Sequence, residues 1–344
     1  MFSFSTHAAN SDSVSDRYKS MALQGDLSRA ESLFSSMNPD TAPTFVVELA
    51  ERFQARFVVQ SEDLSPGTGD AFTDAVISAY RKYWVLTLMG DISHQKGEDF
   101  LESSLHQVLS MQSKVEFSDH AASVFELVGN IFDEKGVHYL DTPAPPLRDM
   151  FLWRTEENRK YAVRLTDRTQ KVSVTFVSDI YSQGWKQYAT LGLVATTGWV
   201  EGDRLYCVES AYDRGSENFE VSYLKHESRH LADFEYFPGL QSADLEYRAK
   251  LTELAFAFTS TRQLLDDFTS KSAPNSASPH AYANYRVTRE IYREMFDKPF
   301  PESGNPWQGI NTQSVNKAAR DLLQRNSNEP GEGLLSGRNR RSIR

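Results

Sequence analysis

The sequence predicts an α+β protein in which a helical N-terminal part precedes a part that contains a β-sheet. Two observations carry this prediction. Between residues 44 and 135 apolar residues recur at helical spacing, as in the series Phe72, Val76, Tyr80, Tyr83 and Trp84. Beyond residue 160 the pattern alternates, and the runs 161–165 and 172–177 contain residue types that favour strands.

Length and composition limit the classes of protein to consider. A chain of 344 residues can form two or three compact units, and 40% hydrophobic residues are enough for ordinary cores. The net charge of −10 argues against nucleic acid as the main partner. No apolar run reaches the roughly 18 residues of a membrane helix. The single cysteine, Cys207, excludes a cysteine-rich zinc site, which leaves histidines and carboxylates as metal ligands.

Residues 1–145 are expected to form a helical accessory domain, which is a candidate surface for a protein partner. Two short helices with a turn at Gly25-Asp26 are predicted between residues 18 and 37. Their sequence, GDLSRAESLF followed by NPD, resembles one tetratricopeptide-type helical hairpin, without a clear second copy. Further helices are expected at 44–58, 70–89, 97–112 and 118–135.

The segment Asp141–Pro146 contains three prolines, cannot continue a helix, and is interpreted as a linker. The domain boundary is therefore placed there, with a second domain at 146–325. Residues 326–344 are rich in glycine and arginine and are expected to form a disordered tail.

The second domain is expected to begin with a small sheet. Besides 161–165 and 172–177, strands are predicted at 193–200 and 205–209, joined by a hairpin turn at Glu201-Gly202-Asp203. Ser216 then suits the N-cap of a helix.

This helix contains the motif H-E-x-x-H at residues 226–230. On a helix, residues four apart lie one above the other, so His226 and His230 can direct imidazole nitrogens at one zinc ion. Glu227 flanks that position and can accept a proton from a metal-bound water. The motif therefore predicts a zinc-dependent hydrolase.

The two histidines belong to an apolar stripe of helical spacing, which indicates a side that faces the core. The stripe consists of Phe219, Tyr223, His226, His230 and Phe234. Core histidines satisfied by neighbouring carbonyls or carboxylates are the alternative interpretation.

The order of sheet, edge hairpin, H-E-x-x-H helix and second helix resembles the catalytic module of thermolysin-like, gluzincin-type metallopeptidases over residues 160–268. The resemblance implies a zincin-like domain that binds one Zn2+ per chain and cleaves a peptide or protein substrate. It also implies an edge strand, Ala195–Trp199, that pairs with the bound peptide through Gly198 and Trp199. A packing role for Trp199 is the alternative.

A catalytic zinc site with two histidines needs a third protein ligand. The metzincin pattern fails, because it would need Gly at Asp233 and His at Tyr236. A second helix is predicted from Ser242 to about Phe268, and Glu246 stands where the gluzincin family has its third ligand. Glu253, Asp233 and Glu235 are the alternatives.

The sequence departs from the thermolysin pattern at Lys250, where that family often has an Asp that orients a zinc histidine. Another residue must then orient His226. The family also supplies a His or Tyr after the second helix to stabilise the oxyanion, which selects His280, Tyr282 and Tyr285 as candidates. These residues begin a helix predicted at 280–295, and a last helix is expected at 313–325.

Two functions from different classes follow. The first is a zinc metallopeptidase, and the alternative is a non-catalytic helical interaction protein with a zincin-like domain. Glu227 favours the enzyme, since a domain without turnover has no need of a general base. If Met1 is the native start, the lack of a signal sequence predicts a cytoplasmic protein; removal of a signal would predict a periplasmic or secreted one.

Overall fold

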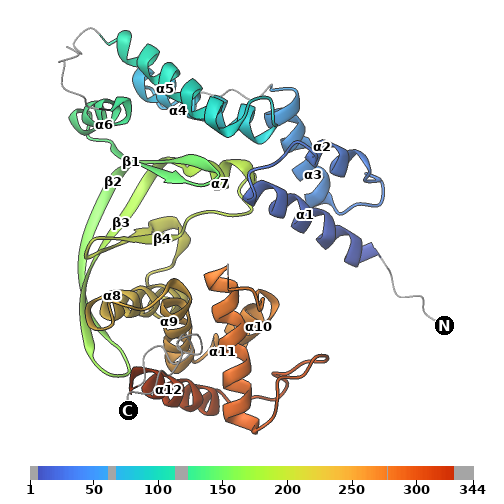
Figure 1. Cartoon of the computed structure of the whole chain (residues 1–344), viewed down its shortest axis with the longest axis vertical. Coiled ribbons are helices and arrows are strands. Elements are labelled where there is room, and N and C mark those ends of the chain that lie inside the picture. Colours follow the sequence, from blue (N-terminus) through green and yellow to red (C-terminus); the bar gives the residue numbers. More distant parts are fainter. Residues whose placement is uncertain (1–6, 61–66, 113–122, 277, 329–344) are drawn as a thin grey trace, which may run out of the picture. The chain divides into compact units, whose positions relative to one another are not determined.

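The chain forms a mixed α+β structure with one five-stranded sheet of strand order β1-β2-β3-β5-β4 (Figure 1). This computed structural model describes residues 7–60, 67–112, 123–276 and 278–328. It confirms the expected α+β class. The chain divides into two compact units, Met1–Glu156 with Val177–Thr196, and Glu157–Phe176 with Thr197–Arg344.

The first unit is mainly helical. Its helices are α1 (His7–Leu23), α2 (Ala30–Ser35), α3 (Thr44–Phe53) continuing into π-helical η1 (Gln54–Val58), α4 (Ala71–Leu88), α5 (His94–Ser110) and α6 (Val124–Glu134). They confirm the predicted helices, except that residues 118–122 of the last one lie outside the described residues. The tetratricopeptide-like character of the first pair stays a prediction.

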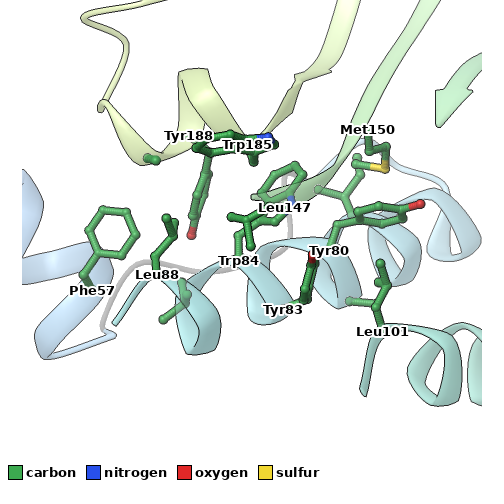
Figure 2. Close-up of a cluster of buried hydrophobic side chains, with 14 of the residues drawn as sticks. Phe57, Tyr80, Tyr83, Trp84, Leu88, Leu101, Leu147, Met150, Trp185 and Tyr188 are labelled. Carbon is green, nitrogen blue, oxygen red and sulfur yellow. The ribbon is translucent and has the colours of Figure 1, made fainter. Parts of the chain in front are cut away.

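Helix α4 organises the core of this unit. Asp70 begins the helix by accepting a hydrogen bond from the backbone N–H of Thr73 at 2.9 Å. Figure 2 shows Tyr80, Tyr83 and Trp84 on the aromatic face of this helix. The ring of Trp84 lies against that of Tyr188, from a later segment of the chain, with ring centroids 5.5 Å apart. Trp84 also donates its indole N–H to the carbonyl of Arg148. The bulky side chains are therefore buried without leaving that donor unsatisfied.

The segment 141–146 is not a linker, and the expected boundary there is wrong. Residues 138–144 form strand β1 (His138–Ala144), which pairs antiparallel with β2 (Leu147–Arg164) around the turn Pro145-Pro146. Proline is compatible with this strand because β1 is at the edge of the sheet, where half of the backbone N–H groups need no partner. The first 145 residues are therefore not wholly helical.

The two longest strands, β2 and β3 (Thr169–Gln183), contribute to both units, which divide after residues 156 and 176 (Figure 1). They include residues 161–164 of one predicted strand and all of the other, 172–177. Helix α7 (Gly184–Ala189) follows, then β4 (Gly198–Glu201) and β5 (Arg204–Val208). The hairpin turn at 202–203 is confirmed, but the strand expected from residue 193 begins only at Gly198.

The second unit continues with helices. They are η2 (Glu209–Ala211), π-helical η3 (Asn218–Lys225), α8 (His226–Tyr236), α9 (Ser242–Phe256), α10 (Thr261–Ser270), α11 (Pro279–Phe296) and α12 (Thr312–Asn328). One core joins α9 to α12, and another joins the sheet to η3 and α8. Of the expected tail, residues up to Asn328 are helical, and the rest lies outside the described residues.

The helix expected from Ser242 to Phe268 is broken, and the prediction of a single helix is wrong. Ala257 adopts an extended conformation. The carboxylate of Glu217 accepts hydrogen bonds from the backbone N–H groups of Phe258, Thr259 and Ser260 at 2.7–3.1 Å. A residue about forty positions earlier therefore satisfies donors at the break.

Within the described residues, no helix combines the length and the apolar character needed to cross a membrane.

Candidate metal centre

The H-E-x-x-H motif lies at the junction between η3 and α8. Ser216 accepts a hydrogen bond from the backbone N–H of Phe219 at 3.1 Å, as expected for a cap. The predicted apolar stripe holds through Phe219 and Tyr223 but fails at Phe234, whose side chain is 53% exposed. Phe234 lies on α8 two steps of four residues after His226, and each such step rotates the side chain by about 40° on an α-helix, so Phe234 leaves the buried face.

The structure brings His226, His230 and Glu246 together between α8 and α9. The Nε2 atoms of the two histidines are 3.1 Å apart. Glu246 Oε1 lies 3.4 Å from His230 Nε2, and Glu246 Oε2 lies 3.8 Å from His226 Nε2. One ligand atom from each residue can be chosen so that all three lie within 4.8 Å of one another. This group has the donor set that the sequence predicts.

Glu253 holds the other nitrogen of His226. Its carboxylate oxygen lies 2.8 Å from His226 Nδ1, so Nδ1 carries the proton and Nε2 is directed at the cluster. Burial would lower the pKa of His226, but the hydrogen bond and charge of Glu253 raise it above its ordinary value. Glu253 was an alternative candidate for the metal ligand. In the structure its carboxylate contacts the outer nitrogen of His226 instead, and it can orient that ring as Lys250, which has no carboxylate, cannot.

Two buried polar atoms of the cluster have no hydrogen-bond partner among the described residues, His230 Nδ1 and Glu246 Oε2. His280 Nδ1 lies 2.9 Å from Glu246 Oε2. Burial would raise the pKa of the Glu246 carboxyl, yet His230 and His280 hold it well below its usual range. A buried polar atom without a hydrogen bond, such as His230 Nδ1, typically costs about 1–3 kcal/mol.

These residues fit a metal ion. In a tetrahedral zinc site with bonds of about 2.0–2.1 Å, two ligand nitrogens are separated by about 3.3 Å. The two Nε2 atoms are 3.1 Å apart. Glu246 adds an oxygen that is already ionised. Two imidazoles, one carboxylate and a carboxylate on the outer histidine nitrogen are characteristic of such sites.

Glu227 follows His226 on α8 and is half-buried. Its charge reaches Tyr212: burial is the main cause of the raised pKa of Tyr212, and Glu227 and Glu253 add to it. The hydroxyl of Tyr212 donates to Thr197 Oγ1 at 3.3 Å, directly before β4. The charge of Glu227 therefore acts on a tyrosine that is hydrogen-bonded directly before the edge strand.

The residues proposed for substrate binding lie on that edge strand. A Cβ atom at Gly198 would come within 2.6 Å of both the Tyr206 carbonyl oxygen and the Tyr223 ring, so only glycine fits. Trp199 stacks on Tyr206 with ring centroids 4.8 Å apart, which supports its packing role. β4 pairs with β5 on one side and ends the sheet on the other.

Among the described residues, the contacts join only His280, of the three alternative candidates for oxyanion stabilisation, to the cluster. His280 reaches Glu246, and its side chain is 73% exposed. Tyr282 stacks on Tyr285 with ring centroids 6.3 Å apart. Among the contacts of the described residues, none joins either tyrosine to the three-residue cluster.

A second buried cluster, which the sequence did not predict, is formed by Arg229, Asp233 and Arg248, whose side chains are at most 1% exposed. Asp233, considered as a ligand, instead accepts hydrogen bonds from both arginines. Glu235 is exposed near the end of α8 and does not belong to the metal-binding group. Two arginines within an otherwise buried helix pair are the signal that could have revealed this cluster.

No protein-family model, curated protein or solved structure matches the chain. Its function has to be inferred from the chemistry of this site.

Proposed function

We propose that the protein is a zinc-dependent metallohydrolase, most simply a metallopeptidase, that binds one zinc ion through His226, His230 and Glu246. One observation carries the proposal: the Nε2 atoms of both histidines and an ionised carboxylate converge within 4.8 Å, and Glu253 holds the outer nitrogen of His226. Two imidazoles and one carboxylate leave a fourth position open, as in catalytic zinc sites.

The chain's own residues have distinct roles in this proposal. Bound zinc supplies a Lewis acid that polarises the scissile carbonyl. Glu227 accepts the proton of the attacking water and delivers it to the leaving amine. Glu253 keeps the Nδ1 proton on His226, so that Nε2 remains a ligand. The free edge of β4 offers backbone groups to an extended peptide.

The first test is metal analysis of purified wild-type protein and of the variants His226→Ala and His230→Ala. Wild type should contain one zinc per chain, and each variant should lose stoichiometric metal because two ligands do not hold a catalytic ion. His106→Ala, at an exposed position of α5, is the matched control and should keep the metal. Full zinc occupancy in both site variants would refute the ligand assignment.

The second test separates chemistry from metal binding. Glu227→Gln should retain metal and fold but lose about 10²- to 10⁴-fold in turnover of peptides, because the general base is gone. Glu235→Gln changes an exposed glutamate of the same helix and should leave turnover unchanged. If the Glu227 variant cleaves as fast as wild type, Glu227 is not the base. A zinc-loaded wild type that cleaves no peptide of a diverse library would favour the non-catalytic interaction protein.

A further inference from the structure

A buried lysine lies beside the metal-binding residues. Lys250 is 8% exposed and stands on α9, four residues after Glu246 and three before Glu253. This spacing directs all three side chains to one face of the helix. Lysine is rarely buried to this extent unless its charge has a partner.

The ammonium group of Lys250 acts on the cluster. Its Nζ lies 3.9 Å from Glu246 Oε2, the oxygen that lacks a hydrogen bond. It also lies 4.8 Å from the centre of the Phe268 ring, a contact that stabilises a cation. Its charge opposes protonation of His226. Lys250 is thus held between an aromatic ring and the carboxylate of a proposed ligand.

Lys250 is a cation among several acidic side chains. Glu227, Glu246 and Glu253 provide three carboxylates near the histidines, and Lys250 provides one ammonium among them. Without the lysine, the metal-free protein would keep three neighbouring carboxylates around partly buried histidines, which is costly in a low-dielectric interior. A fixed cation close to a metal ion also repels that ion.

We infer that Lys250 is a positioning residue that substitutes for part of the metal's charge: it holds Glu246 in place in the metal-free protein and lowers the affinity of the site for a divalent cation. This inference rests on the proposed metal-binding function. It implies a site that stays assembled when it loses its ion and exchanges that ion readily. Lys250 therefore sets the affinity for the metal without being a ligand.

The experiment compares Lys250→Met with wild type in a competition titration of zinc against a chromophoric chelator. Removing the charge while keeping an unbranched chain on Phe268 should tighten zinc binding about 10- to 100-fold. The metal-free variant should melt at a lower temperature than metal-free wild type, and added zinc should raise its melting temperature by more. Structural damage to the site would weaken binding, so the sign of the change separates the two explanations.

Three further variants complete the test. Lys250→Arg keeps the charge and should bind zinc as wild type does. Lys250→Gln removes the charge without methionine and should also tighten zinc binding, even if the methionine variant does not fold. Lys317→Met removes a charge at a side chain that is 77% exposed and should change nothing. Unchanged or weaker zinc binding in the uncharged variants would overturn the inference alone. If wild type binds no stoichiometric zinc, the proposed function fails first, and this inference fails with it.

Discussion

The same two helices, α8 and α9, enclose two buried polar clusters that differ in one respect. Around Asp233, the guanidinium groups of Arg229 and Arg248 donate hydrogen bonds of 2.7–3.3 Å to both carboxylate oxygens. Around Glu246, one carboxylate oxygen has no hydrogen-bond partner among the described residues, and neither has His230 Nδ1. We call the cluster around Asp233 saturated, because both carboxylate oxygens accept hydrogen bonds, and the cluster around Glu246 unsaturated.

This difference teaches how to separate a structural network from a binding site. Arg229 and His230 are neighbours in the chain, and both are buried. Burial and charge alone therefore do not distinguish them. A buried group that folding leaves unpaired is costly, and a ligand that completes its contacts removes that cost. The carboxylate of Asp233 accepts hydrogen bonds at both oxygens, whereas Glu246 Oε2 and His230 Nδ1 have no hydrogen-bond partner among the described residues.

The largest effect on stability is expected at the saturated cluster. Asp233→Ala leaves Arg248 without its buried carboxylate, and breaking a buried pair of this kind typically costs about 3–5 kcal/mol in the free energy of unfolding. Urea denaturation of the metal-free protein measures this loss. The control, Asp321→Ala, breaks the exposed pair with Lys317 and should cost less than about 1 kcal/mol. A loss at Asp233 no greater than that of the control would remove the distinction between the clusters.

A smaller effect, on metal binding, is expected at the unsaturated cluster. Glu253→Gln replaces the carboxylate that holds His226 Nδ1 at 2.8 Å, and outer contacts of this kind are typically worth about 10- to 100-fold in metal affinity. Chelator competition should therefore show weaker zinc binding, opposite in sign to the change expected for Lys250→Met. Glu294→Gln, which alters the surface pair with Arg325, is the control. Unchanged affinity in Glu253→Gln would mean that another group orients His226.

The smallest effect is expected at Glu217, a saturated carboxylate like Asp233 but closer to solvent. Partial burial would raise its pKa, but hydrogen bonds from Thr259, Phe258 and Ser260 lower the pKa from 4.5 to about 2. Because the folded-state pKa is the lower one, Glu217 stabilises the fold fully above pH 4.5. This contribution is lost as the pH falls from 4.5 towards 2.

The urea midpoint, measured between about pH 5 and about pH 2, tests whether Glu217 loses its stabilising effect as the pH falls. Glu217→Gln should show a weaker pH dependence than wild type in that window, whereas Glu302→Gln, at an exposed position, should follow wild type. A variant that loses stability with acid as steeply as wild type would show that the hydrogen bonds of Glu217 do not act through its charge.

Several expectations succeeded because they depended on contacts close in sequence. The spacing of Phe72, Val76 and Tyr80 requires only that one face of a helix be buried, and α4 forms there. The alignment of His226 with His230 follows from one turn of helix. The prediction that Glu246 lies near both histidines required a second helix that returns after a short break. That information came from the resemblance to gluzincins and not from the local pattern.

Other expectations failed where distant residues decided the outcome. The proline-rich segment 141–146 contains strand residues because β2 provides a pairing partner and an edge position tolerates proline. The helix after Ser242 ends at Phe256, where Glu217 binds the backbone N–H groups that follow. No local pattern in α9 indicates that interruption.

The sequence by itself determined which residues carry the candidate chemistry: two histidines on one helical face, a glutamate between them and acidic residues on the next helix. Only the tertiary structure decided the role of each acidic residue. It directs Glu246 at the histidine Nε2 atoms, Glu253 at the outer nitrogen of His226, and Asp233 at two arginines. The reason is physical. Helical periodicity sets the direction of a side chain from its own helix, whereas the atom it meets depends on how neighbouring helices pack.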